Sequence, residues 1–318
     1  MVQKNSRILV TGGAGFIGSH MVDKLIETDA EVTVLDNLDT GKMENIAQHE
    51  KNSNFNFVKG DIRNLQLVKQ LVKDTDAVIN LAAIASVQRS IENPLLVNDV
   101  NVIGTLNLLK ASVEGNVKRF IQASSAAVYG DAQTLPVRED FNPMPLSPYA
   151  VSKLATDNYA LVFNHVYGLE TVCLRFFNVY GPRQANNPYS GAITIFANEI
   201  LAHRPPRIFG DGEQTRDFVF VEDVISATML ALTEKNAAGE IFNVASGKAT
   251  TINQIVEILQ KIMGENLKPV HDKPREGDIR HSYASTEKAR TILGYDPMFS
   301  LEEGLRELVR YMTNSVEN

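Results

Sequence analysis

The chain has 318 residues, of which 44% are hydrophobic and 22% charged, and its formal net charge is −7 at pH 7. Dividing this length by about 150 residues per domain predicts roughly two domains, with room for a large buried core. The single cysteine, Cys173, excludes a disulfide framework and a cysteine zinc site, and the net acidity disfavours general nucleic-acid binding.

Short apolar runs alternate with longer amphipathic runs over the first two thirds of the sequence. We expect strands at residues 7–11, 31–35, 56–58, 77–81, 119–123 and 171–176, and helices at residues 17–27, 65–73, 94–114 and 148–167. This alternation is typical of a parallel sheet covered on both faces, so the predicted fold class is α/β, a Rossmann-type doubly wound parallel sheet. In such sheets, ligands bind beyond the carboxyl ends of the strands.

The pattern changes after about residue 181. Residues 182–190 and 204–215 are rich in Pro, Gly and Asn and predict long loops, and the strand-like residues 219–221 and 241–244 could return to the sheet. The remaining sequence predicts two or three helices and a loop at residues 272–279. We therefore expect a cofactor-binding domain at residues 1–180, with returning segments near 217–246. A smaller, mostly helical substrate-binding lobe would comprise residues 181–216 and 247–318.

A glycine-rich turn follows the first predicted strand and reads G-x-x-G-x-x-G from Gly12 through Gly15 to Gly18. Such glycines let the backbone approach a pyrophosphate, and the N-terminus of the next helix points its N–H groups at that anion. The second strand ends at Asp36, whose carboxylate would bind an adenosine ribose and repel a 2′-phosphate. The turn and the carboxylate favour NAD over NADP, and a glycine-rich turn without a ligand is the alternative.

The helix predicted at residues 148–167 begins with a Ser–Pro pair and carries Tyr149 and Lys153 one turn apart. A phenol with a pKa near 10 is a poor base at pH 7. A neighbouring ammonium and the positive helix end favour the phenolate, so the pair could serve as acid and base. Upstream, Ser124 and Ser125 follow the strand predicted at residues 119–123, past its carboxyl end, where a sugar or nicotinamide would lie. A surface helix with a solvated Lys is the alternative.

These three motifs together resemble the extended short-chain dehydrogenase/reductase family, and within it the nucleotide-sugar 4-epimerases. Further segments support the resemblance along essentially the whole chain, among them Asn178–Tyr180 with the following Gly-Pro, and Arg216 with the following Asp-Phe. The resemblance implies that Tyr149 is the catalytic base and acid, that Lys153 is its electrostatic partner, and that Ser125 hydrogen-bonds the 4-oxygen of the sugar.

The resemblance also implies the two binding sites. The cofactor contacts would be Gly12, Gly15, Phe16, Ile17, Gly18, Asp36, Asn37, Asp61, Ile62, Leu81, Ala82, Ala83, Asn101, Ser124, Tyr149, Lys153 and Phe176. The UDP-sugar contacts would be Ser86, Ser125, Tyr149, Asn178, Ala192, Ile193, Arg207, Phe209, Arg216, Arg275, Asp278 and Ser282. Arginine suits a diphosphate because its planar fork binds two oxygens at once.

Three departures from related enzymes narrow the activity. Ala126 and Ala127 replace the acids that dehydratases and decarboxylases of the superfamily carry before the tyrosine of the serine strand. Asn178 stands where uronic-acid epimerases typically have Thr, and no Arg for a substrate carboxylate is obvious. Ser282 is small where some galactose epimerases carry an aromatic residue, so a 2-acetamido group would fit, although an ordinary loop serine is an equal alternative.

The sequence thus predicts an NAD-dependent 4-epimerase for UDP-glucose/UDP-galactose, and with them the N-acetylated pair. The alternatives are another NAD(P)-dependent nucleotide-sugar oxidoreductase, such as a uronic-acid epimerase or a 4-ketoreductase, and a non-catalytic NAD-binding regulatory protein. Apolar residues on more than one face of the helices at 94–114 and 148–167 suggest a homodimer through a four-helix contact, as the family has. Six scattered histidines, no apolar run near about 18 residues and a polar start predict a cytoplasmic protein with no metal.

Overall fold

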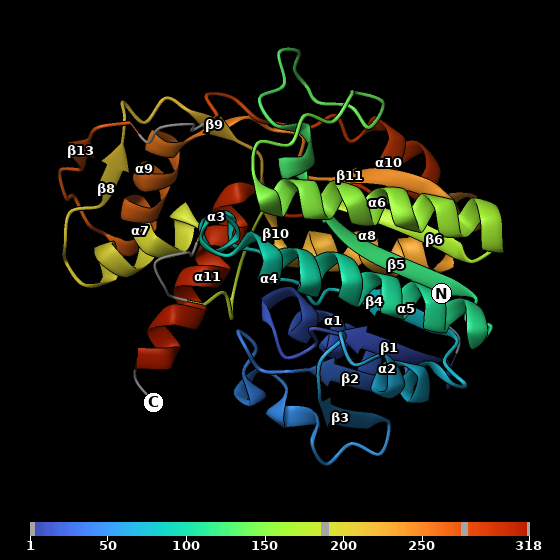
Figure 1. Cartoon of the computed structure of the whole chain (residues 1–318). Coiled ribbons are helices and arrows are strands. Elements are labelled where there is room, and N and C mark those ends of the chain that lie inside the picture. Colours follow the sequence, from blue (N-terminus) through green and yellow to red (C-terminus); the bar gives the residue numbers. More distant parts are fainter. Residues whose placement is uncertain (1–3, 186–190, 275–278, 317–318) are drawn as a thin grey trace.

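Seven parallel strands form the centre of the molecule, in the order β11-β6-β5-β4-β1-β2-β3. The computed structural model describes residues 4–185, 191–274 and 279–316 (Figure 1). The strands are β1 (Arg7–Thr11), β2 (Glu31–Asp36), β3 (Phe55–Lys59), β4 (Ala77–Asn80), β5 (Arg119–Ser125), β6 (Glu170–Phe176) and β11 (Glu240–Val244). The prediction of a parallel doubly wound sheet is confirmed, with shifts of a residue or two at the strand ends.

Both faces of this sheet are buried, which explains the near-continuous apolar strands. Successive side chains point to opposite faces, so Ile8 and Val10 of β1 pack with one group of helices and Leu9 with the other. Helices α1 (Phe16–Ile26) and α8 (Val221–Thr233) contribute to the first apolar cluster, and α2 (Leu65–Val72) and α5 (Gly104–Glu114) to the second. Helix α6 (Pro148–Tyr167) packs on β5 and β6 beside α5.

The helix predicted at residues 94–114 runs through three segments in the structure. Helix α4 (Pro94–Asn98) continues into a π-helical segment, Asp99–Ile103, and then into α5. A further short helix, α3 (Val87–Glu92), precedes it and was not predicted, because its six residues carry too short an amphipathic pattern. Short 3₁₀ helices occur at Met43–Asn45, Ala47–His49, Ala126–Tyr129 and Lys235–Ala237.

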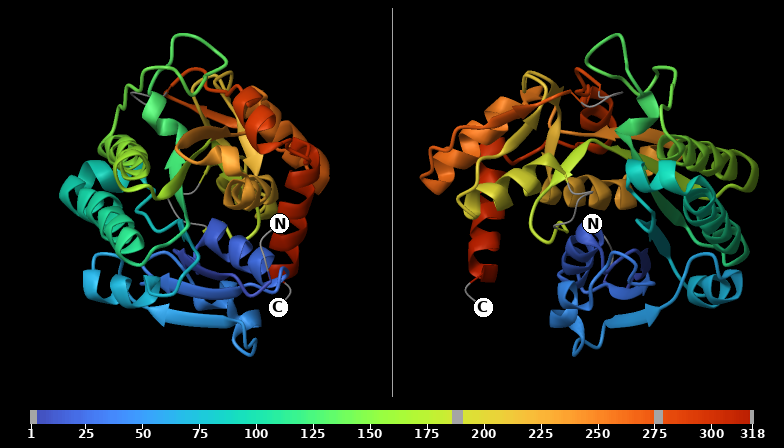
Figure 2. Two further views of the ribbon diagram at one scale, coloured as in Figure 1. Left: turned by 90° about the vertical axis from the view of Figure 1, so that its right-hand side faces the viewer. Right: turned by 60° about the vertical axis from the view of Figure 1, so that its left-hand side comes forward.

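A smaller lobe lies beside the carboxyl ends of the strands (Figures 1 and 2). It contains α7 (Ala192–Leu201), α9 (Ile252–Met263) and α11 (Leu301–Val316), with the strand pairs β8 (Arg207–Phe209)/β13 (Val270–Asp272) and β9 (Thr215–Arg216)/β12 (Thr250–Thr251). Helix α10 (Glu287–Leu293) contacts β11 and α8 instead. Three helices in the last segment agree with the sequence, whereas α7 and α8 were not predicted. The domain boundaries stay a prediction.

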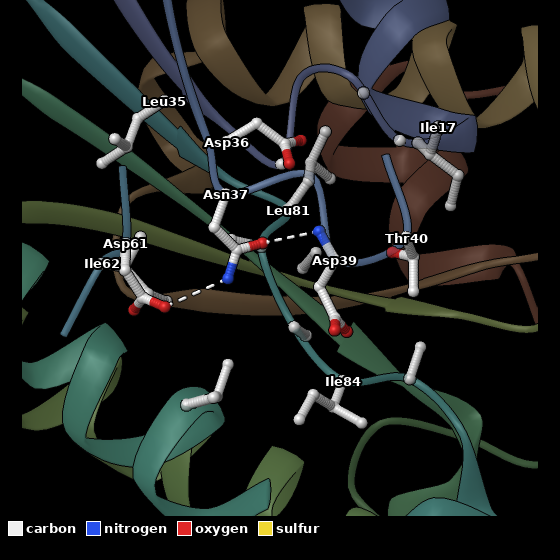
Figure 3. Close-up of a pocket in the computed structure, with 18 of the residues that line it drawn as sticks. Ile17, Leu35, Asp36, Asn37, Asp39, Thr40, Asp61, Ile62, Leu81 and Ile84 are labelled. Atoms are coloured by element: carbon white, nitrogen blue, oxygen red, sulfur yellow. Dashed lines mark hydrogen bonds between the residues drawn. The ribbon is translucent and has the colours of Figure 1, made fainter. Parts of the chain in front are cut away.

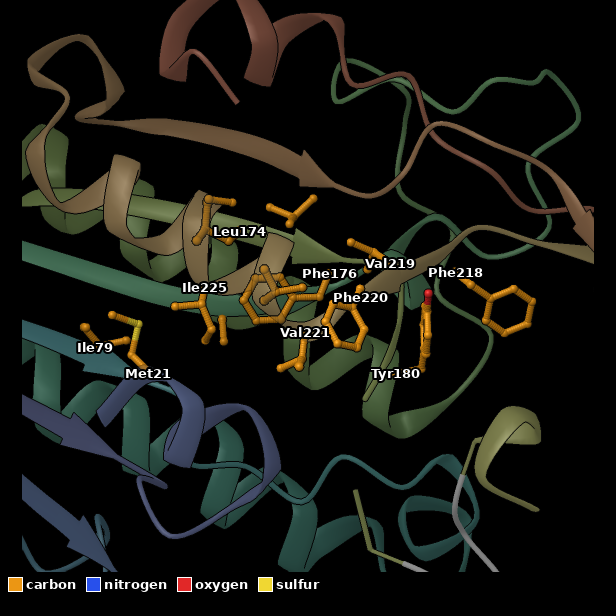
Figure 4. Packing of buried hydrophobic residues seen from close by; sticks show 14 of the residues in the cluster. Met21, Ile79, Leu174, Phe176, Tyr180, Phe218, Val219, Phe220, Val221 and Ile225 are labelled. Atoms are coloured by element: carbon orange, nitrogen blue, oxygen red, sulfur yellow. The ribbon is translucent and has the colours of Figure 1, made fainter. Parts of the chain in front are cut away.

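Two expectations about the second half are wrong. The run near residue 219 does not return to the large sheet, since β10 (Phe218–Phe220) pairs with β7 (Asn178–Tyr180). Strand β10 is nonetheless buried, and its Phe220 ring lies 5.5 Å from the ring of Tyr180 on β7 (Figure 4). Residues 204–215 are not only loop, because β8 and the start of β9 lie there. Strands this short pair with partners far along the chain, so no local pattern shows them. Strand β11 does return to the sheet as predicted.

The predicted loops at residues 182–190 and 272–279 lie partly outside the described residues, which leave out 186–190 and 275–278. Among the helices of the described ranges, none is both long enough and apolar enough to cross a membrane. Within the same ranges, no three or more His, Cys, Asp or Glu side chains are grouped so as to hold a metal ion.

Candidate active site

The glycine turn between β1 and α1 is packed so closely that side chains cannot be accommodated. Gly12 has a φ of +71°, and a Cβ there would lie 2.8 Å from the backbone nitrogen of Ala82. A Cβ at Gly18 would lie 2.1 Å from the carbonyl oxygen of Gly12. Helix α1 begins after Gly15, which offers no capping side chain, and no acidic residue occupies the first turn. Its N-terminus therefore suits an anion such as the pyrophosphate of a dinucleotide.

The carboxyl end of β2 presents the acidic residue expected for a ribose. Asp36 accepts hydrogen bonds from the backbone N–H groups of Ala14 at 3.0 Å and Leu38 at 2.8 Å, and burial raises its pKa. Beside it, Asn37 donates to Asp61 at 3.0 Å (Figure 3). Hydrogen bonds from Arg63 lower the pKa of Asp61 to about 2. Asp61 therefore stays ionised near neutral pH, and the two carboxyl groups offer oxygen lone pairs to ribose and adenine.

One cavity connects this end of the sheet with the start of α6. It brings together sixteen of the seventeen predicted cofactor residues: Gly12, Gly15, Phe16, Ile17, Gly18, Asp36, Asn37, Asp61, Ile62, Leu81, Ala82, Ala83, Ser124, Tyr149, Lys153 and Phe176. The missing residue is Asn101, which lies buried on the π-helical segment. The Asn101 side chain accepts a hydrogen bond from the backbone N–H of Ile84. It also donates to the backbone carbonyl oxygen of Ile84 and to the hydroxyl of Ser152 on α6. Asn101 thus positions the wall of the cavity from behind.

Sequence reasoning missed several residues of the same cavity. Asp39, Thr40, Arg63 and Arg89 also line it. Arg89 on α3 forms an ion pair with Asp39 at 2.8 Å across the rim. The two residues are far apart in sequence and each lies in an ordinary polar segment, so no local signal identifies them.

Helix α6 begins as its sequence predicts. Ser147 accepts a hydrogen bond from the N–H of Ala150 at 3.2 Å, and Pro148 occupies the first turn. Tyr149 and Lys153 are 8% and 5% exposed, which excludes the alternative of a solvated surface lysine. The Lys153 ammonium donates to the carbonyl oxygen of Ala123 at 2.9 Å.

The Ser125 hydroxyl lies beside the phenol of Tyr149, and it is therefore close to the tyrosine–lysine pair that lines one end of the cofactor cavity. Burial raises the pKa of Tyr149, and the neighbouring hydroxyl of Ser125 opposes that effect. Burial also lowers the pKa of Lys153 to about 8, although the negative charge of Asp157 acts to raise it. The phenol is therefore protonated in the protein alone, and its ionisation needs further positive charge beside it.

The charge on Lys153 predicts a decline of activity at alkaline pH. Its ammonium loses a proton as the pH rises through about 8, so kcat/KM should fall above that value. The measurement is the pH profile of kcat/KM. Lys153→Met, which has no titrating group at this position, should be slower and should lack the alkaline decline. If wild type and Lys153→Met show the same alkaline decline, the decline comes from another titrating group.

A second cavity lies between β7, α7 and the β8/β13 pair. It is lined by six predicted substrate residues, Asn178, Ala192, Ile193, Arg207, Phe209 and Arg216, together with Gln184, Glu199, Arg204 and Phe218, which the sequence did not suggest. Three arginines beside apolar and aromatic side chains offer charge to a diphosphate and a flat contact to a base.

Buried Asp217 fixes the strand that carries Arg216. Its carboxylate accepts hydrogen bonds from the N–H and hydroxyl of Ser246 and from the N–H groups of Gly247 and Ala284, at 2.7–3.1 Å. Four donors from two separate segments hold the Asp217 carboxylate. They therefore fix the position of the neighbouring Arg216 at the cavity.

A third hollow joins the first two cavities between the body and the lobe. Phe16 and Arg89 line it together with the first cavity, and Gln184 together with the second. Ser86 lies in this hollow, but its hydroxyl caps α3 by accepting from the N–H of Arg89 at 3.1 Å. Ser125 and Ser282 are not among the described residues that line the three spaces. Arg275 and Asp278 lie outside the described residues.

The fold and the site together define a dinucleotide-binding enzyme of the short-chain dehydrogenase type, with a tyrosine–lysine pair on the cofactor cavity. A family model described as GDP-mannose 4,6 dehydratase matches residues 9–308. A putative UDP-glucose 4-epimerase of Methanocaldococcus jannaschii is 44% identical over 97% of this chain and 99% of its own length. A UDP-glucuronate 4-epimerase of Thermodesulfobacterium geofontis is 37% identical over 97% of each chain.

Solved structures agree with these relatives. The UDP-glucose 4-epimerase of Thermotoga maritima with UDP-glucose has a TM-score of 0.92 and 41% identity, covering 98% of this chain and 99% of that one. A UDP-N-acetylglucosamine 4-epimerase of Methanobrevibacter ruminantium, with UDP-N-acetylmuramic acid, has a TM-score of 0.94 and 39% identity, covering 98% and 100%. A Thermus thermophilus UDP-glucose 4-epimerase with NAD has a TM-score of 0.88 and 37% identity, covering 97% and 99%.

The chain belongs to the extended short-chain dehydrogenase/reductase family, among its nucleotide-sugar 4-epimerases. This confirms the resemblance, the fold class and the expectation of an epimerase-like isomerase. NAD in solved neighbours confirms it as the cofactor of the family.

Proposed function

We propose that this chain interconverts the C4 epimers of UDP-hexoses with a tightly held NAD. The observation that carries the proposal is that Tyr149, Lys153 and the glycine turn line one cavity, with the Ser125 hydroxyl beside the phenol. Cofactor and acid–base group would then reach the same carbon of a sugar. A regulatory NAD-binding protein would not need this set.

The residues divide the chemistry among them. The α1 N-terminus would hold the pyrophosphate of NAD, Asp36 its adenosine ribose, and Lys153 its nicotinamide ribose. Bound NAD supplies an oxidant for C4 and a positive charge near the phenol. Tyr149 then takes the proton of the 4-hydroxyl and returns it when the alcohol re-forms, while Ser125 holds the 4-oxygen.

Binding energy for the substrate would come from the nucleotide. The second cavity presents Arg207 and Arg216 to the diphosphate and Phe209 to the uracil. A 4-keto sugar has to turn over between the two half-reactions, and strong bonds to the hexose would prevent that.

The decisive experiment incubates the purified protein, without added cofactor, with UDP-glucose, UDP-N-acetylglucosamine or UDP-glucuronate in separate reactions. Chromatographic separation of the nucleotide sugars should reveal the galactose or N-acetylgalactosamine epimer. Conversion of UDP-glucuronate alone would assign the uronic-acid activity of the relative from Thermodesulfobacterium geofontis. Recovery of all three sugars unchanged would remove the epimerase proposal.

We further propose that a small residue at position 282 admits the 2-acetamido group. Ser282 donates its N–H to the carbonyl oxygen of Thr215, beside Arg216 on β9. A Ser282→Tyr variant should lose about tenfold or more in kcat/KM for UDP-N-acetylglucosamine relative to UDP-glucose, because the ring would fill the space of the acetamido group. Ser282→Ala, which adds no volume, should keep the wild-type ratio. If both variants keep it, position 282 does not select the substrate.

A homodimer is proposed through one face of the α3–α6 layer. Exposed apolar residues gather there: Val87, Ile91, Leu95 and Ile103, and, on α6, Val151, Tyr159, Val162 and Val166. The α6 members recur at spacings of three, four or eight residues and so share one helix face. Helices α3, α4 and α6 contact one another, which makes the patch continuous. An apolar surface of this kind suits a second copy of the chain.

Leu95→Glu should therefore convert the dimer into monomers, because the side chain is 82% exposed in one copy and a charge there would be desolvated at the interface. Sedimentation velocity at matched concentration measures the effect. Met298→Glu is the control, since Met298 is 72% exposed outside these helices. Identical sedimentation of both variants and wild type would contradict the interface.

A further inference from the structure

We infer that His20 and Asp23, on the cofactor-binding helix α1, are positioning residues for the nucleotide-sugar site. They hold the backbone segment 182–185, whose Gln184 lines both the third hollow and the substrate cavity. The inference rests on the proposed function for the identity of the ligand. Substrate affinity would then depend on side chains of α1, the helix whose N-terminus faces NAD.

The first tether is made by His20. This side chain is 8% exposed, and its Nε2 lies 3.0 Å from the carbonyl oxygen of Pro182. Its Nδ1 lies 3.1 Å from the Glu222 carboxylate on α8, which fixes the orientation of the ring. The ring also makes an edge contact with Phe16, whose side chain lines both the cofactor cavity and the third hollow.

The second tether is an ion pair between Asp23 and Arg183, with Oδ2 and Nη1 2.7 Å apart. Both side chains are only about a quarter exposed, at 27% and 22%. The Nη1 atom is buried and lacks a well-aligned hydrogen bond, so charge attraction dominates this contact. Arg183 has a φ of +65°, a left-handed conformation that costs free energy outside glycine. The ion pair offsets that cost and keeps the segment in this conformation.

The segment then reaches the substrate lobe through Gln184. Its side-chain carbonyl accepts from the hydroxyl of Thr194 on α7 at 2.6 Å, and its amide donates to the carbonyl oxygen of Val179 on β7 at 3.2 Å. Strand β7 carries Asn178, and α7 carries Ala192 and Ile193 in its first turn. A displaced segment would therefore move three side chains that line the substrate cavity.

Asp23 also binds a second segment at the cofactor side. Its Oδ1 lies 2.6 Å from Nε2 of His49 and accepts from Gln48 at 2.8 Å, on the chain that follows β2. One carboxylate thus ties together the loop after β2, helix α1 and the segment after β7. This arrangement predicts that loss of its charge weakens substrate binding and spares the chemistry at Tyr149.

The test uses the protein as purified, with its bound NAD, and compares wild type with Asp23→Asn, Arg183→Gln and the double variant. Calorimetry with UDP gives Kd, and kinetics with UDP-glucose gives KM and kcat. Absorbance after denaturation gives the NAD content. Glu27→Gln is the matched control, because Glu27 follows the same helix and its ion pair with Lys24 is exposed.

Asp23→Asn should raise Kd and KM about tenfold, as loss of a charged partner does, with kcat within about twofold and NAD content unchanged. Arg183→Gln should act alike, Arg183→Lys should recover part of the affinity, and the double variant should be no worse than the weaker-binding single variant. Unchanged UDP affinity, additive single effects, or parallel losses of NAD and kcat would overturn the inference. Wild type that neither binds UDP nor converts any sugar would instead remove the proposed function.

Discussion

Tyr149→Phe should lower kcat by about 10²- to 10⁴-fold while leaving the NAD content of the protein unchanged. The substitution removes only the phenolic oxygen, which lies beside Ser125 at the end of the cofactor cavity. The aromatic ring still fills its site, and the α1 N-terminus and Asp36 still face the dinucleotide. Loss of acid–base chemistry without loss of cofactor therefore separates a catalytic role from a structural one.

The measurement is the initial rate of UDP-glucose conversion, together with NAD released on denaturation. Tyr167→Phe is the control, because Tyr167 ends the same helix and is 57% exposed. This control should match wild type in both quantities. A Tyr149→Phe variant that turns over at the wild-type rate would show that another group moves the proton, and equal loss of NAD and rate would make Tyr149 a cofactor contact only.

Local sequence rules predicted the part of the site that is made of contiguous turns. A dinucleotide turn needs glycines at fixed spacing after a strand, so Gly12, Gly15 and Gly18 predict the turn and the pyrophosphate site beside it. Likewise the cap at Ser147 and the four-residue spacing of Tyr149 and Lys153 follow from helix geometry. The structure adds that these motifs share one cavity, which the sequence could only suggest through strand order.

The parts that sequence reasoning missed depend on contacts between distant segments. Asp23 meets Arg183, and Arg89 meets Asp39, from positions whose neighbours show no special pattern. Electrostatics also departed from the simple expectation. Lys153 was expected to lower the pKa of Tyr149, yet burial dominates and raises it. Desolvation depends on the whole surrounding packing and has no signature within a short motif.

A buried ion pair beneath the catalytic residues illustrates the same limit. Asp157 lies one turn beyond Lys153 on α6 and is fully buried, and its Oδ2 accepts from the Nε of Arg175 at 3.0 Å. The Arg175 guanidinium also lies 4.7 Å from the ring of Tyr129. Tyr129 in turn donates to Asn243 at 2.7 Å, which links β11 to this pair.

Asp157→Ala should reduce the free energy of unfolding by about 3–5 kcal/mol, because it leaves the buried Arg175 charge without its carboxylate. Replacing both residues, as Asp157→Leu with Arg175→Met, removes the unpaired charge and should restore most of the stability. Urea unfolding of the three proteins at matched NAD occupancy measures the difference. Asp157 also favours the charged form of Lys153, so the double variant should show its alkaline decline at lower pH than wild type.

The comparison between single and double variants decides whether the pair is needed for folding or for the site. Stability that returns in the double variant, with the alkaline decline shifted downward, would mean that Asp157 acts on Lys153 through its charge. Stability that stays low in both variants would mean that the packing around Arg175, and not the unpaired charge, limits the fold. A single variant as stable as wild type would show that Arg175 finds another partner, which the present geometry does not offer.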